Sequence, residues 1–200
     1  MTGGITFDET MEGWFALGAD APEAGAIIGE HAGTRLTMRA TVVGDDLDRF
    51  IAVREHPGAL SGAVDFQPLG IGLLAPLGVF QLFSPGPGED ARRMVYELAF
   101  RVGERSYYLA GEKRVRHDTA LDLWKDTTTL FTRLHEGESA AGPVIGAGVL
   151  TLGVPQLLAL VSTLRATSGG NAATVAAFGR FFFGELWDVY APHVAASGGA

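Results

Sequence analysis

The feature that most constrains the fold of this chain is a pair of alternating segments, Arg93–Val102 and Arg105–Val115, joined by Gly103-Glu104. In the first segment every second residue is apolar, which gives one hydrophobic face formed by Met94, Tyr96, Leu98 and Phe100. Period-two alternation on both sides of a short, glycine-containing turn is typical of a β-hairpin. We therefore predict that these two segments pair as antiparallel strands.

Other parts of the chain also show strand or helix patterns. Strands are predicted at Met11–Leu17, Arg35–Val43, Leu60–Phe66, Gly78–Phe83, Thr127–His135 and Gly148–Leu152. Helices are predicted at Asp46–Val53, Pro155–Thr163 and Ala172–Tyr190. The stretch Gly18–Gly33 has too little apolar periodicity for a prediction, and Gly70–Gly78 is interpreted as a turn.

Many short strands followed by helices predict an α+β protein. We expect an antiparallel β-barrel or β-sandwich with the C-terminal helices packed against it, as one domain over residues 1–192, and a disordered tail over residues 193–200. The order strand, capped turn, short helix occurs twice, in Arg35–Val53 and in Gly146–Leu164. A fold made of two related halves would explain this repeat, although the similarity is one of pattern and not of identity.

Composition narrows the class of partner. The 200 residues are 47% hydrophobic and 19% charged, which is enough to bury a sizeable core. A net charge of −8 argues against a nucleic-acid-binding surface. The charge-free stretch between Glu138 and Arg165 is interrupted by glycine and proline, so we predict strand, turn and helix there and no transmembrane span. Since the start of the sequence lacks an apolar leader segment, we expect a soluble, cytoplasmic protein.

Signatures of cofactor, metal and catalytic sites are missing from the sequence. Gly70–Gly78 lacks the third glycine of a dinucleotide-binding loop, and there is no Walker loop and no G-x-S-x-G elbow. The absence of cysteine excludes thiolate metal sites, and most histidines stand next to acidic residues, a spacing that chelates poorly on a strand. We predict no cofactor and no metal, and we assign no catalytic residue.

Candidate ligand-binding residues lie in the hairpin and in the threonine-rich segment that follows it. Lys113 shares a face with Val115, so it either guards an edge strand by its charge or points inward, toward a ligand or toward Asp126. The threonines are either ordinary strand formers or hydroxyls that line a barrel interior holding a small apolar molecule. On the second interpretation, the ligand-binding residues are Tyr96, Tyr108, Lys113, Trp124, Thr128 and Thr132.

The last predicted helix, Ala172–Tyr190, has apolar residues on nearly all of its sides. Packing on a single core needs only one apolar stripe. The helix is therefore either deeply buried or covers a second surface, such as another copy of the chain. Phe183 and Trp187 lie four residues apart on one helical face and would anchor such a homo-oligomer.

Seven segments of the chain resemble a known family. They are FDETMEGWFALG (7–18), DDLDRFI (45–51), GVFQLF (78–83), RRMVYELAF (92–100), LAGEKRVRHD (109–118), LDLWKDTTTLFTRL (121–134) and FGRFFFGELWDVY (178–190). Together they resemble a region of long, multidomain, cholesterol-oxidase-like flavoproteins of the glucose-methanol-choline oxidoreductase group. The resemblance covers nearly the whole chain, but the flavin-binding domain of that group is absent, so no flavin site is carried over to any residue. It implies an accessory module that works beside enzymes acting on sterol-like or other lipid substrates.

These observations lead to a ranked expectation of function. We expect a non-catalytic accessory or binding module for an apolar, lipid or sterol-like ligand or for a partner oxidoreductase. The alternative is a small barrel enzyme of the cyclase or isomerase type, with Tyr, Glu and His around an enclosed apolar cavity. A third possibility is an interaction domain that dimerises through its last helix.

Overall fold

The fold is known from a computed structural model that describes residues 3–86, 91–115, 126–167, 169–182 and 184. In chain order its elements are β1 (Ile5–Leu17), α1 (Pro22–Ala32), β2 (Arg35–Gly44), α2 (Leu47–Ala52), β3 (Pro57–Phe66), β4 (Gly70–Pro85), β5 (Arg92–Val102), β6 (Arg105–Val115), β7 (Thr129–Glu136), β8 (Val144–Thr151), α4 (Val154–Thr163) and β9 (Arg165–Ala166). Residues 172–182 form a further helix.

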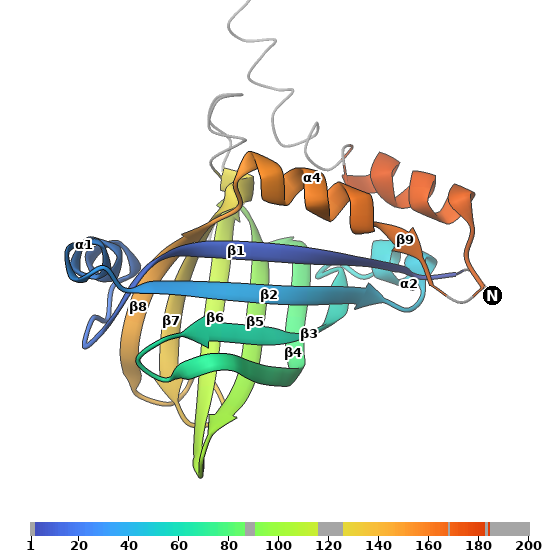
Figure 1. The fold of residues 1–200 in the computed structure, drawn as a ribbon. Coiled ribbons are helices and arrows are strands. Elements are labelled where there is room, and N and C mark those ends of the chain that lie inside the picture. Colours follow the sequence, from blue (N-terminus) through green and yellow to red (C-terminus); the bar gives the residue numbers. More distant parts are fainter. Residues whose placement is uncertain (1–2, 87–90, 116–125, 168, 183, 185–200) are drawn as a thin grey trace, which may run out of the picture.

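Eight antiparallel strands, β1 to β8, close into a barrel (Figure 1). Each strand pairs with the next one along the chain, and β1 pairs with both β2 and β8, which removes the free edges. The short strand β9 adds to the start of β1. The barrel prediction is thus confirmed, and the β-sandwich alternative is wrong because a sandwich would leave two sheets with open edges.

The predicted hairpin is confirmed. Strands β5 and β6 pair without interruption from Arg92 opposite Val115 to Val102 opposite Arg105. Gly103 occupies the turn with a φ of 60°, a left-handed conformation that glycine adopts without strain. Strand β6 also pairs with β7, so the interpretation of Lys113 as a guard of an edge strand is wrong.

Two other sequence predictions need correction. Gly70–Gly78, interpreted as a turn, is the first half of β4 and pairs with β3, because the β3–β4 turn is completed before Gly70. Strand β1 begins at Ile5, well before the predicted start at Met11, and the unassigned stretch after it contains α1.

The helices cover the barrel in two places (Figure 1). Helix α1 packs on β1 and β8, while α4 and the helix of residues 172–182 lie along the top of the view, at the barrel end opposite the turn of the β5–β6 hairpin. Helix α4 is tied to β1 by a hydrogen bond from the backbone N–H of Asp8 to Thr163 Oγ1, at 2.9 Å. The prediction that C-terminal helices pack on the barrel is confirmed for the described residues, while the tail at 193–200 lies outside them.

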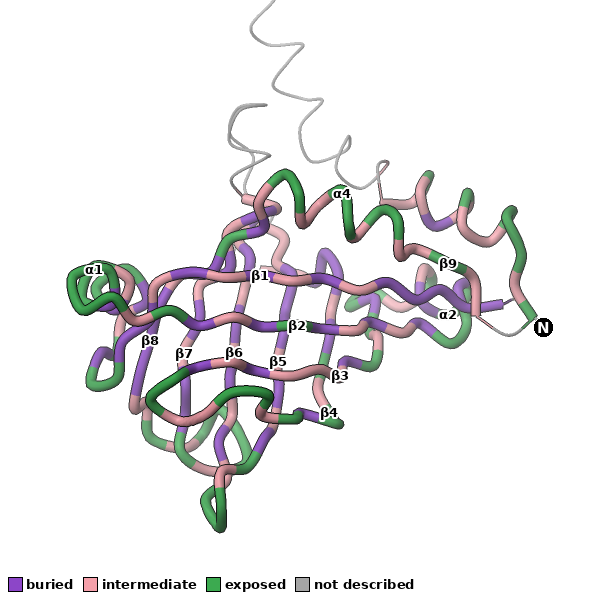
Figure 2. Tube along the Cα trace, in the orientation of Figure 1, coloured by how far each residue is buried: buried purple, intermediate pink, exposed green. Residues whose placement is uncertain are grey.

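Buried positions alternate along most strands, as Figure 2 shows by the change between purple and the other colours. In β5 the inward row holds the predicted residues Met94, Tyr96, Leu98 and Phe100. The barrel interior is therefore filled mainly by apolar side chains that come from every second residue. Within the described ranges, no helix has the length and apolar character needed to cross a membrane.

Candidate functional site

A cavity of about 420 Å³ lies between one end of the barrel and the two helices that cover it. The strands contribute Phe7, Phe80, Leu82 and Met94 to its wall. The covering helices contribute Leu157, Leu160, Leu164, Phe178 and Phe182. The lining is therefore largely apolar, with few polar groups, which is the usual character of a small-molecule site.

A cluster of aromatic rings forms the part of the wall where strands meet the last helix. The ring of Phe80 makes edge-to-face contacts with Phe7 and Tyr96, at centroid distances of 6.0 and 5.1 Å. Phe7 also contacts Phe178, which lies beside Phe182. These contacts join β1, β4 and β5 to the helix of residues 172–182 and hold that helix over the cavity.

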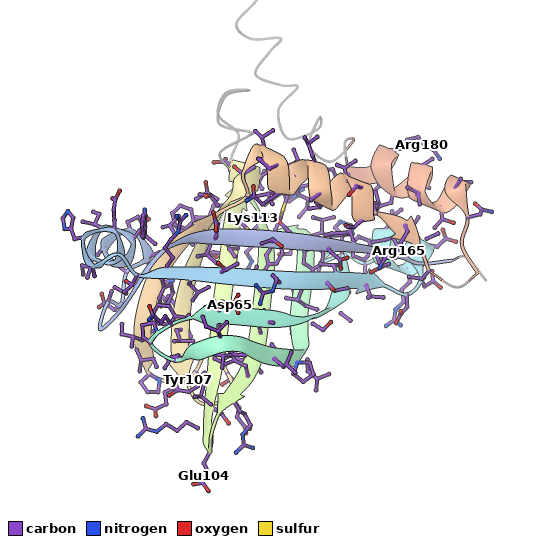
Figure 3. All side chains as sticks on the ribbon, in the orientation of Figure 1. Asp65, Glu104, Tyr107, Lys113, Arg165 and Arg180 are labelled. Carbon is purple, nitrogen blue, oxygen red and sulfur yellow. The ribbon has the colours of Figure 1, made fainter. Side chains whose placement is uncertain are left out.

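Among the described residues, two charged side chains line the cavity, Glu9 of β1 and Lys113 of β6. Lys113 Nζ lies 2.5 Å from Glu9 Oε1, and the two side chains are only 3% and 1% exposed. The Tyr96 hydroxyl donates a 2.7 Å hydrogen bond to the other carboxylate oxygen, Oε2. Lys113 Nζ also lies 4.8 Å from the centroid of the Tyr96 ring, within the range of a cation–π contact. Figure 3 labels Lys113 in the upper part of the barrel, below the helices.

Strand alternation places these three groups inside the barrel. Glu9 shares the inward row of β1 with Phe7 and Met11, and Lys113 shares that of β6 with Val115. In the order of the closed barrel, β5 lies opposite β1, and β6 is the neighbour of β5. The contacts from Glu9 to Tyr96 and Lys113 therefore cross the barrel interior.

The three polar groups form the floor of the cavity. Below them the next inward side chains are Met11, Leu98 and, beyond Gly111, Leu109, which are buried and do not line the cavity. Above them lie the aromatic rings and the leucines of α4. The site is thus a largely apolar cavity with the Glu9–Lys113–Tyr96 cluster at its inner end.

The environment of Tyr96 fixes its protonation state. Burial raises the pKa of the Tyr96 hydroxyl well above its usual value of 10.0, and the neighbouring Glu9 carboxylate raises that pKa further. The hydroxyl therefore stays protonated and acts as a hydrogen-bond donor to Glu9.

The structure brings together three of the six predicted ligand-binding residues, Tyr96, Lys113 and Thr128, all of which line the cavity. Thr132 also faces inward, but its hydroxyl donates to the carbonyl oxygen of Gly148 and it lies outside the cavity lining. Tyr108 faces outward, where its hydroxyl donates to Glu97 Oε2 at 2.7 Å.

The other predicted positions lie outside the residues that the structure describes. Trp124, Trp187 and the side chain of Phe183 do not belong to the described part of the chain. The homo-oligomer anchored by Phe183 and Trp187 therefore stays a prediction.

Sequence reasoning missed Glu9, the partner of Lys113. Its signal is present in the alternation of β1, where the inward positions Ile5, Phe7, Glu9 and Met11 are all apolar except Glu9. An acidic residue in an otherwise apolar row requires a buried partner, and Lys113 is a charged residue in the inward row of β6. The sequence prediction left open whether an inward Lys113 points toward a ligand or toward Asp126, and in the structure its ion-pair partner is Glu9 instead of Asp126.

Within the described ranges, no three His, Asp or Glu side chains gather in a way that could hold a metal ion. Comparison of the chain with protein-family models, with curated proteins and with solved structures finds no match. The geometry of the cavity is therefore the main indication of function.

Proposed function

We propose that this protein binds a small apolar molecule in the cavity between its barrel and its covering helices. The observation that carries the proposal is a chamber of about 420 Å³ walled by phenylalanine, leucine and methionine side chains. Ligand sites commonly have volumes of about 300–1,000 Å³ and mostly apolar walls. A ligand that fills the chamber removes its own apolar surface from water, which contributes roughly 25 cal/mol for each Å² buried.

The proposed role beside a partner enzyme rests on the sequence resemblance. A region similar to part of cholesterol-oxidase-like flavoproteins would hold or pass on a lipid or sterol-like molecule beside a partner oxidoreductase. The cavity supports the part of this proposal that concerns an apolar ligand, because its wall suits such a molecule. The partner enzyme is supported by the resemblance alone.

A barrel enzyme of the cyclase or isomerase type is the second candidate, and the Glu9–Lys113–Tyr96 group favours it. A carboxylate and an ammonium at the floor of an apolar chamber are groups that could move a proton on a bound substrate. The high pKa of Tyr96 weakens this candidate, because a hydroxyl that holds its proton so firmly is a poor general acid. If the wild-type protein converts a bound ligand and Glu9→Gln does not, the enzyme hypothesis would be favoured over binding alone.

The binding proposal is tested with two leucines of the same helix. Leu160 lines the cavity, whereas Leu158 is 65% exposed. We expect Leu160→Trp to fill part of the chamber and to weaken binding of the uncharged dye Nile red at least tenfold, while Leu158→Trp leaves binding unchanged. Fluorescence titration measures both affinities, and circular dichroism checks that each variant is folded. Equal dye binding by folded Leu160→Trp would exclude this cavity as the site.

A further inference from the structure

The floor of the cavity carries no net charge. In the part of the chain that the structure describes, Glu9 and Lys113 are the two charged side chains of the lining, and they form an ion pair with each other. Any charged group on a ligand would therefore enter a site whose charges are already matched. In an apolar environment an unmatched charge is strongly disfavoured.

The three groups of the floor also differ in the hydrogen-bond donors that they have left for a ligand. Glu9 accepts from Lys113 on one oxygen and from Tyr96 on the other, and the Tyr96 hydroxyl uses its single donor in that bond. An ammonium has three N–H donors, and among the residues that the structure describes Glu9 Oε1 is the one acceptor of Lys113 Nζ. Of the three floor groups, Lys113 is therefore the one that keeps hydrogen-bond donors for a ligand.

From this arrangement we infer that the cavity selects a neutral amphiphile, namely an apolar molecule with one uncharged hydroxyl or carbonyl oxygen that accepts a hydrogen bond from Lys113 Nζ. This inference rests on the proposed function, since it names the class of ligand for the same cavity. A carboxylate ligand is excluded because it would compete with Glu9 for Lys113 and place two carboxylates around one ammonium. An amine ligand is excluded because its positive charge would lie beside that of Lys113.

The test compares three ligands with the same carbon chain: 1-dodecanol, methyl dodecanoate and dodecanoate at neutral pH. Displacement of Nile red measures the relative affinities. For the wild-type protein we expect the alcohol and the ester to bind at least tenfold more tightly than the carboxylate. An apolar cavity of any kind would show part of this preference, so the decisive comparison is made with Glu9→Gln.

In Glu9→Gln the charge of Lys113 has lost its partner, and a ligand carboxylate can now supply one. We expect the preference to invert, so that dodecanoate binds to this variant more tightly than 1-dodecanol does. The matched control is Glu12→Gln, because Glu12 lies on the same strand, faces outward and pairs with Arg35 at 3.4 Å. Glu12→Gln should keep the wild-type order of affinities.

A second variant covers the case in which Glu9→Gln does not fold. In Glu9→Gln/Lys113→Met both charges are gone, so dodecanoate should stay weak, and 1-dodecanol should bind about tenfold less tightly because the Lys113 donor is lost. Unchanged alcohol affinity in this variant would overturn the inference. So would tight binding of dodecanoate by the wild-type protein, which would leave the proposed function intact. If none of the three ligands displaces the dye from the wild-type protein, the proposed function and this inference both fail.

Discussion

Lys113 and Glu9 illustrate how a single buried pair can shape a cavity. Removing two charges from water is costly, and their mutual attraction offsets this cost only when the geometry is good and the remaining hydrogen bonds are made. Here the carboxylate has a partner on each oxygen, and the ammonium lies over an aromatic ring. Loss of one of the two charges should therefore destabilise the barrel more than loss of both.

We predict that Lys113→Met lowers the free energy of unfolding by about 3 kcal/mol, because it leaves the Glu9 carboxylate buried without its counter-charge. The double variant Glu9→Gln/Lys113→Met should regain most of this loss. Arg114→Met is the control, since Arg114 is the next residue on β6, faces outward and is one third exposed, and it should cost less than about 1 kcal/mol. Urea unfolding measures all three. If Lys113→Met is as stable as the wild-type protein, the Glu9–Lys113 pair is not buried in the way the structure shows.

Tyr96 gives a prediction about alkaline pH. Its folded pKa is raised well above 10.0, so the stability that it contributes is fully present below about pH 10 and is lost as pH rises toward the folded pKa. At about pH 11 we expect Tyr96 to remain protonated in the folded protein and to ionise in the unfolded chain. Ultraviolet absorbance of tyrosinate reports this difference.

The variant Tyr96→Phe isolates the contribution of that residue among the four tyrosines. At about pH 11 it should leave the tyrosinate signal of the folded protein unchanged and lower the signal of the unfolded chain by one quarter. A fall in the folded signal would show that Tyr96 ionises in the native state and that its hydroxyl is not held by Glu9.

The inward orientation of Lys113 and Tyr96 could be predicted from the sequence, because period-two alternation fixes which residues of a strand share a face. The partner of Lys113 could not be predicted in the same way. Predicting β1 only from Met11 removed Glu9 from the strand, and the pairing of β1 across the barrel is a long-range property that local alternation does not contain.

Among the elements, α1 shows most clearly why sequence patterns can fail. The face that packs on the barrel holds the buried residues Pro22, Gly25 and Gly29, while Ile27 and Ile28 are exposed. A hydrophobic stripe is absent because the contact is made by the backbone, at short distance from β1 and β8. A methyl group added at Gly29 would lie 2.5 Å from the backbone nitrogen of Phe15.

We predict that Gly29→Ala destabilises the protein by about 2 kcal/mol, although alanine has the higher helix propensity, because the added methyl group pushes α1 away from the barrel. The matched control is Gly179→Ala in the helix of residues 172–182, where an added methyl group has no neighbour within 4 Å. That variant should raise stability by about 0.5–1 kcal/mol. Thermal unfolding distinguishes the two. Similar effects of both substitutions would contradict the close packing of α1.

For the whole molecule, closure of the barrel is the property that creates the site. Alternating strands predict an antiparallel β fold but do not distinguish a barrel from a sandwich, since both bury every second residue. The difference lies in the pairing of β1 with β8 at one edge and with β2 at the other. Closure brings Glu9 opposite Tyr96 and Lys113, and the two C-terminal helices then cover the space above them.

Whether this cavity holds a small apolar molecule is best measured by native mass spectrometry of protein purified from its host and then mixed with 1-dodecanol. We expect one small molecule bound to each wild-type chain, either carried through purification or added. Binding should be kept in Leu158→Trp and lost in Leu160→Trp. A wild-type chain that stays free of ligand before and after the addition would contradict this expectation.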